Sequence, residues 1–252
     1  MTTRGLRITR ARARRFDGRS ELSLDPNLRV FVTDLTRPYG LPVREDLLRA
    51  GVGHSYEEMA AGLLREELAD DEPVDLLILA FDSPDVRPGA PSSLALSRSC
   101  PGSPLAFAVC DQGLGAAFTA LRLAAEYHRT GFCRRAVVVV AEQTALHYAP
   151  GAPVRLPERH GAVVLVCEEA PGESMDIRQM PCADEPEKEV RTLAESLEPG
   201  TALVRGPGVG GPTAQPFTGV WAELAEGLPQ RTPVLVASFD RRLGVLNTLA
   251  LP

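Results

Sequence analysis

The chain has little of what usually marks a metal site, a membrane span or a nucleic-acid surface. Its five cysteines are scattered and odd in number, and no pair has the short spacing of a zinc site. No apolar run approaches the roughly 20 residues that cross a bilayer. The formal net charge is −6 and the pI about 5.4, which gives no reason to expect a nucleic-acid partner. We therefore expect a cytoplasmic protein with reduced thiols, without a metal, a cofactor or a membrane.

Two common enzyme motifs are also missing. The glycine-rich stretch at residues 206–212 lacks the Lys-Ser/Thr pair of a phosphate-binding loop, and its prolines remove backbone donors. No Gly-x-Ser-x-Gly sequence occurs, which excludes a serine nucleophile elbow of that kind.

What is present is enough apolar sequence for a large core, because 44% of the 252 residues are hydrophobic. Arginine alternates with apolar residues over positions 4–15, which favours a first strand with an arginine-rich exposed face over a targeting segment. The apolar and turn patterns predict further strands at residues 29–33, 74–80, 105–109, 136–141, 162–167, 175–180, 201–205, 233–238 and 244–251. They predict helices at residues 55–68, 92–99, 111–128, 187–197 and 217–227.

Taken in order, these elements form two similar series, each ending in two successive strands. The first series reads β-α-β-α-β-α-β-β, and the second is shorter by one strand–helix unit. The pattern predicts an α/β fold built from a duplicated unit, with a first half at residues 1–170 and a reduced second half at 171–252.

Cys110 is the residue with the clearest chemical potential. It follows the predicted strand at 105–109 and precedes the predicted helix at 111–128. A helix N-terminus favours an anion, so a thiol there is a candidate nucleophile with a lowered pKa. The alternative, that Cys110 is a small buried residue filling the junction, stays open on local sequence alone.

Four segments in this order resemble the ketoacyl synthase III type of the thiolase-like superfamily. They are Val74–Ala80, Phe107–Ala116, Arg134–Glu142 and His160–Leu165, similar to the family's IDLIIVAT, DVSAACSGF, KRVLVVGAE and GAGAVVL segments. The resemblance covers about residues 28–168 and is weak afterwards. It implies the duplicated βαβαβαββ fold with α/β/α/β/α layers, the second half being truncated. It also implies that Cys110 takes an acyl group as a thioester from coenzyme A or an acyl carrier protein.

The second half departs from this family pattern. The four histidines lie at positions 54, 128, 147 and 160, so the family's second-half histidine has no counterpart. Pro212 stands where the resemblance would place an asparagine, and Phe239–Leu243 replaces the glycine-rich turn that lends an oxyanion donor. Decarboxylative condensation is therefore not expected. His147 is the candidate base, with a surface-loop histidine as the alternative. Glu142 and His160 are expected to be structural, and Asp111 and Gln112 to satisfy helix amides.

Three functions remain open. The first is acyl transfer through Cys110 in polyketide or fatty-acid type secondary metabolism. The second is a non-catalytic subunit, similar to a chain-length factor, that pairs with a complete ketosynthase. The third is a small hydrolase or scaffold, since a fold does not fix a function. The resemblance implies a homodimer or a heterodimer with a ketosynthase.

Overall fold

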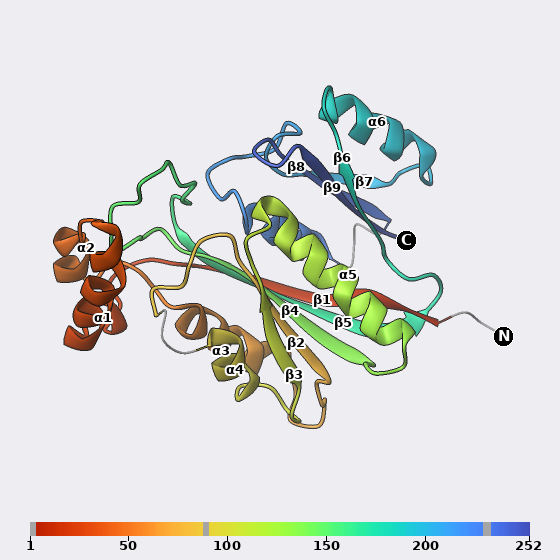
Figure 1. The fold of residues 1–252 in the computed structure, drawn as a ribbon. Helices are drawn as coiled ribbons and strands as arrows, with labels where there is room; N and C mark the ends of the chain where they lie inside the picture. The colour runs from red at the N-terminus through yellow and green to blue at the C-terminus, as the bar shows by residue number, and fades with distance from the viewer. Residues whose placement is uncertain (1–3, 88–90, 229–232) are drawn as a thin grey trace.

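Two β-sheets and three layers of helices make up the molecule (Figure 1). The computed structural model describes residues 4–87, 91–228 and 233–252. The first sheet has the strand order β1-β5-β4-β2-β3 and the second the order β6-β9-β8-β7.

The strands are β1 (Arg4–Phe16), β2 (Leu76–Ala80), β3 (Leu105–Val109), β4 (Arg135–Glu142), β5 (His160–Pro171), β6 (Asp176–Pro181), β7 (Ala202–Arg205), β8 (Val234–Asp240) and β9 (Val245–Leu251). The helices are α1 (Pro26–Thr36), α2 (Glu45–Ala50), α3 (Tyr56–Glu67), α4 (Ser92–Ser97), α5 (Ala116–Arg129), α6 (Pro186–Ser196) and α7 (Gly219–Gly227). Short 3-10 turns are η1 (Leu22–Leu24), η2 (Arg37–Tyr39) and η3 (Gly113–Gly115).

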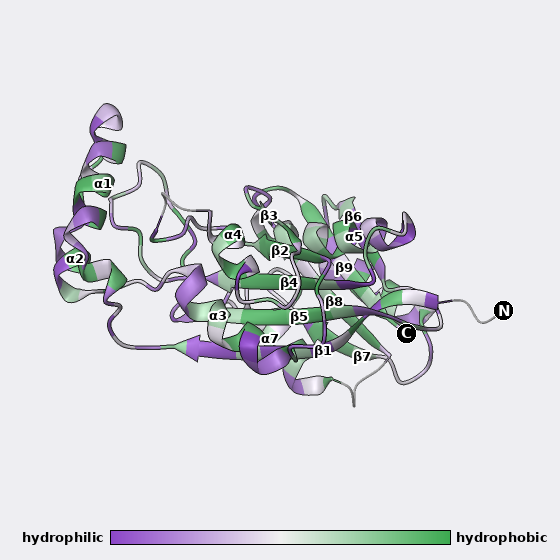
Figure 2. Cartoon of the chain, turned by 90° about the horizontal axis from the view of Figure 1, so that it is seen from below, coloured by the Kyte–Doolittle hydropathy of each residue, from purple (hydrophilic) through white to green (hydrophobic). Residues whose placement is uncertain are grey.

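The central strands of the first sheet are buried on both faces. Alternate side chains of β2 and β4 point to opposite faces. Leu77 and Val137 pack with α3 and α4, whereas Ile78 and Val138 pack with α5 and α7. Continuous apolar runs are typical of strands covered in this way, and Figure 2 shows β4 and β5 as hydrophobic ribbons.

The second sheet covers the other side of α5 and α7. Trp221 of α7 is buried against Phe118 of α5, with ring centroids 4.8 Å apart. Val190 of α6 packs on the outer face of the second sheet, against Leu235. The layers are therefore α/β/α/β/α, and the second sheet has one strand fewer than the first. The predicted fold class, with its truncated second half, is confirmed.

Two predicted elements differ from the structure. Residues 29–33 are not a strand but part of α1, because Asp25 caps the helix by accepting from Asn27 N at 2.9 Å and Pro26 stands in its first turn. The helix predicted from residue 111 begins only at Ala116, after η3. In the part of the chain that is described, no helix is long and apolar enough to span a membrane.

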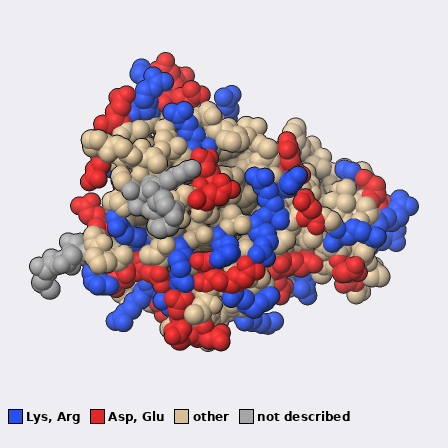
Figure 3. Space-filling view, turned by 180° about the vertical axis from the view of Figure 1, so that it is seen from behind, with Lys and Arg blue, Asp and Glu red and all other residues tan. Residues whose placement is uncertain are grey.

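The arginine-rich first strand is confirmed. Arg12 pairs with Glu67 at 2.7 Å and Arg14 with Glu66 at 2.7 Å, so the basic face of β1 lies along the acidic side of α3. Figure 3 shows basic and acidic side chains interleaved on this side of the molecule. Because these arginines already have acidic partners, the basic N-terminus needs no anionic ligand to explain it.

Candidate functional site

The carboxyl ends of β2, β3 and β8 meet at one edge of the molecule and carry the candidate site. Cys110 follows β3, Asp82 follows β2, and Asp240 ends β8. The charges of Asp240 and Asp111 lie close enough to Asp82 to add to the rise that burial causes in its pKa. Among the cysteines, Cys110 alone is partly exposed, since Cys100, Cys133, Cys167 and Cys182 are buried.

The thiol of Cys110 faces the carboxylate of the next residue. Sγ donates to Oδ2 of Asp111 at 3.5 Å. Burial raises the pKa of the Cys110 thiol, and the hydrogen bond and negative charge of Asp111 raise it further. The predicted lowering of this pKa is therefore wrong. The dipole effect behind that prediction is missing because α5 begins only at Ala116, and η3 separates the thiol from the helix N-terminus.

Asp240 holds the loop that follows the thiol. Its side chain is 1% exposed, and Oδ2 accepts from Leu114 N at 2.9 Å. Oδ1 accepts from Arg242 N at 2.9 Å and from Leu243 N at 3.2 Å. Gly113 has a φ of 52°, and a Cβ there would collide with Oδ2 of Asp240. The turn that replaces the family's glycine-rich segment thus clamps the Cys110 loop.

A polar network of four side chains lies next to the loop; Thr119 and Asn247 are buried, Gln179 is half-buried and Gln112 is exposed. Thr119 Oγ1 lies 3.0 Å from Oε1 of Gln179 and also contacts Oε1 of Gln112. Gln179 Nε2 donates to Oδ1 of the fully buried Asn247 at 3.0 Å and to Gly115 O at 3.2 Å. Gln112 therefore bonds to a side chain rather than to a helix amide. Because the partners come from both halves, sequence reasoning missed this network and the Asp240 clamp.

Two arginines lie beside the acidic side chains of the site. Arg155 Nη1 lies 3.8 Å from Oδ2 of Asp240, and Arg242 Nη2 lies 3.9 Å from Oδ1 of Asp82. Burial raises the pKa of Asp82, and the two arginines oppose that rise. Within the described ranges, no three acidic, histidine or cysteine side chains gather in a way that could hold a metal ion.

His147 lies in the loop between β4 and β5, but it is not a surface residue. It is 4% exposed, and Nε2–H donates to the carbonyl oxygen of Val52 at 2.7 Å. Burial lowers the pKa of its imidazole. No hydrogen bond between His147 and Cys110 is found among the described residues. Its contacts are those of a structural residue, and its role as the base stays a prediction.

Glu142 is structural, as expected, and it joins the two halves. Its carboxylate accepts from Phe217 N at 3.0 Å, from Thr218 N at 2.9 Å and from Gln215 Nε2 at 3.1 Å. Burial raises the pKa of Glu142 although these hydrogen bonds oppose the rise. His160 is also buried, and its Nδ1 accepts from Thr144 N at 3.2 Å.

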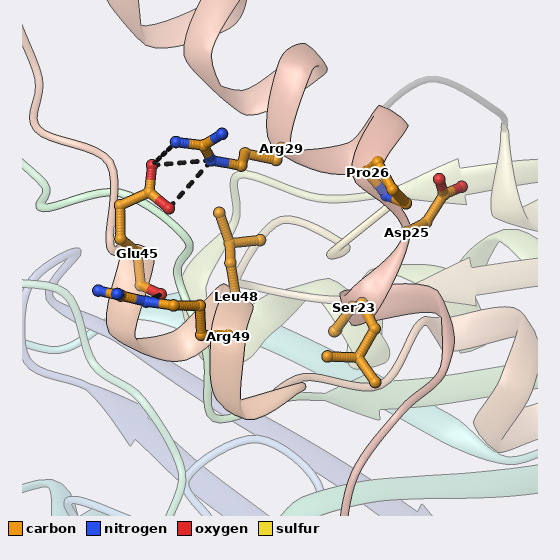
Figure 4. A pocket seen from close by; sticks show the side chains of 8 residues that line it. Ser23, Asp25, Pro26, Arg29, Glu45, Leu48 and Arg49 are labelled. Carbon is orange, nitrogen blue, oxygen red and sulfur yellow. Dashed lines mark hydrogen bonds and ion pairs between the residues drawn. The ribbon is translucent and has the colours of Figure 1, made fainter.

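The hollows described on the surface lie away from the thiol. One, of about 680 Å³, opens between α1 and α2 (Figure 4). Its charged lining is already paired, because Arg29 contacts Glu45 at 2.8 Å and Arg49 Nε donates to Glu45 O at 3.1 Å. Cys110 lines neither this hollow nor the four others described.

Comparisons with known proteins agree with the architecture. No protein-family model and no curated protein matches the chain.

Solved structures do match it. A 3-oxoacyl-(acyl carrier protein) synthase from Burkholderia xenovorans LB400 is 14% identical, with a TM-score of 0.61 over 100% of this chain and 95% of that chain. The acyltransferase ChlB3 is 16% identical, with a TM-score of 0.60 over 98% and 97%. AbyA1, a tetronic acid condensing enzyme, is 14% identical, with a TM-score of 0.61 over 98% and 99%. The chain therefore has the thiolase-like fold of ketoacyl synthase III structures.

Proposed function

We propose that this chain is an acyl-transferring protein in which Cys110 carries the acyl group as a thioester. The observation that carries the proposal is the position of the thiol. It is partly exposed, stands at the carboxyl end of β3, and lies in a loop clamped by Asp240. A loop fixed by buried hydrogen bonds suits a residue that must present one atom to a substrate.

The proposed reaction has two steps. Sγ attacks the carbonyl carbon of an acyl thioester, the bond to the donor's sulfur breaks, and the thiol proton ends on the departing thiolate. In the second step an acceptor attacks the acyl-enzyme and releases Cys110. The donor is an acyl carrier protein or acyl-coenzyme A, by analogy with the carrier-linked synthases of the same fold. The backbone N–H of Cys110 is the candidate oxyanion donor.

Decarboxylative condensation is left out of the proposal. That chemistry needs polar side chains free to polarise a second thioester, and the second half presents Pro212 at the matching position. The nearby Gln179 and Asn247 are bonded to each other in the polar network. The donor of the proposed reaction is an acyl thioester, and a polyketide or fatty-acid type pathway supplies acyl thioesters.

Intact-mass spectrometry after incubation with acyl-coenzyme A and with acyl carrier protein tests the proposal. One acyl group should be added per chain, and Cys110→Ala should abolish the addition. Cys182→Ala is the matched control, because Cys182 is buried and its Sγ contacts the backbone oxygen of Asp184. An adduct that survives in Cys110→Ala would refute the assignment.

A second function has its own support, namely a non-catalytic subunit of a complete ketosynthase. The raised pKa of Cys110 disfavours a resting thiolate, and β3 is an edge strand whose Leu105 is 42% exposed. Pairing along β3 would suit either a homodimer or a heterodimer. Co-purification with a ketosynthase, with Cys110→Ala fully active in that complex, would favour this function over the first.

A further inference from the structure

We propose that Asp111 is the catalytic base of Cys110, taking the proton from Sγ as the thiol attacks. The inference rests on the proposed acyl transfer and adds to it the group that moves the proton. His147 was the base expected from the sequence.

The first observation is the backbone of Asp111. Among the described residues, Asp111 and Glu185 are the only non-glycine residues with positive φ, and Asp111 has a φ of 61°. Few L-residues adopt this region, and aspartate is one of those that tolerate it. Here the conformation brings Oδ2 within 3.5 Å of the Cys110 Sγ.

The second observation is that the residues following this pair are held by hydrogen bonds. Gln112 contacts Thr119, and Leu114 N donates to the buried carboxylate of Asp240. The loop therefore cannot relax easily to move Asp111 away from the thiol. The Asp111 side chain is itself exposed, so solvent and a bound substrate can both reach its carboxylate.

The chemistry follows from these positions. The carboxylate disfavours a resting thiolate, so the proton leaves Sγ only as the bond to the carbonyl carbon forms. Oδ2 accepts that proton, the donor's carbon–sulfur bond breaks, and Asp111 returns the proton to the departing thiolate. The carboxylate is regenerated, and no other reactant is needed.

Asp111→Asn is the decisive variant, because asparagine has nearly the same shape and tolerates positive φ. Two rates are measured at pH 7: alkylation of Cys110 by iodoacetamide, and acylation by acyl-coenzyme A in single turnover. The thiol pKa is measured from thiolate absorbance near 240 nm, with Cys110→Ala subtracted as the blank.

The two rates should move in opposite directions. Loss of the negative charge should lower the thiol pKa and speed alkylation, whereas loss of the base should slow acylation by about 10²–10⁴-fold. Asp111→Glu, which keeps a carboxylate, should recover part of the acylation rate. His147→Gln compares the two candidate bases: its acylation rate should exceed that of Asp111→Asn at least about tenfold, because the His147 ring is bonded to Val52.

Three results would overturn the inference. Acylation of Asp111→Asn within threefold of wild type would show that the carboxylate moves no proton. Acylation that rises together with alkylation would show that Asp111 only suppresses the thiolate. Acylation abolished by His147→Gln at an unchanged fold would assign the base to His147. Failure of the wild-type protein to be acylated at all would instead refute the proposed function, and the inference with it.

Discussion

Acid should weaken the fold through one buried histidine, His160. This side chain at the start of β5 is 5% exposed, and its Nδ1 accepts from Thr144 N. A nitrogen that accepts from an N–H cannot itself carry a proton, so the fold requires a neutral ring. Burial and the neighbouring His54, whose ring centroid lies 4.8 Å away, lower the pKa of His160 to about 4.

The magnitude follows from the difference between the folded and unfolded chains. In the unfolded chain the histidine pKa returns to about 6.5. Between that value and 4, the unfolded state binds more protons, so stability falls as pH falls. The contribution is complete above pH 6.5, and about 2 kcal/mol of it should be lost between pH 8 and pH 5.

Urea unfolding at pH 8, 7, 6 and 5 measures this effect in wild type, His160→Gln and Val138→Ala. Burial raises the pKa of Asp85 and of Glu142, and acid relieves their cost, so the difference between proteins is the quantity to compare. The stability advantage of wild type over His160→Gln should shrink by about 2 kcal/mol at pH 5. Val138→Ala, which removes only buried methyl groups, should stay parallel to wild type. Parallel curves for wild type and His160→Gln would refute the reasoning.

Two further substitutions test the contacts that hold the site. Glu142→Gln turns an amide N–H₂ toward one of the two backbone donors, Phe217 N or Thr218 N, which bond to different carboxylate oxygens. Urea unfolding should therefore show a loss of about 2–3 kcal/mol, and a loss below about 0.5 would contradict the bridge between the halves. Gly113→Ala should destabilise the protein and alter the alkylation rate of Cys110, because its Cβ would collide with Asp240. Gly131→Ala is the control, since Gly131 has a φ of 78° but open space around it, and equal losses in the two variants would contradict the clamp.

The sequence predicted the fold well wherever a segment's own pattern decides its structure. β3 was predicted at its observed bounds, and the capping box at Ser55 is present as expected. The prediction failed at residues 29–33, where the β-branched composition was outweighed by the cap at Asp25 and by burial of Leu28 and Val32 at helical spacing.

The candidate site was predicted only in part. The position of Cys110 followed from the apolar run before it and from the family resemblance. Asp240 could not be found in the same way, because it is 126 residues from its partner Leu114 along the chain. Aspartate adopts a positive φ more often than most residues, but nothing in the sequence around Asp111 marked that position for it. His147 seemed polar and exposed in sequence but is buried by the packing of its loop against Val52.

The most direct test of acyl transfer is peptide mapping of the protein after exposure to an acyl thioester. Acyl transfer through Cys110 predicts one acyl group per chain, bound to the peptide that contains Cys110 and released by neutral hydroxylamine, as a thioester requires. No adduct with either acyl-coenzyme A or acyl carrier protein, or an adduct on another residue, would contradict it.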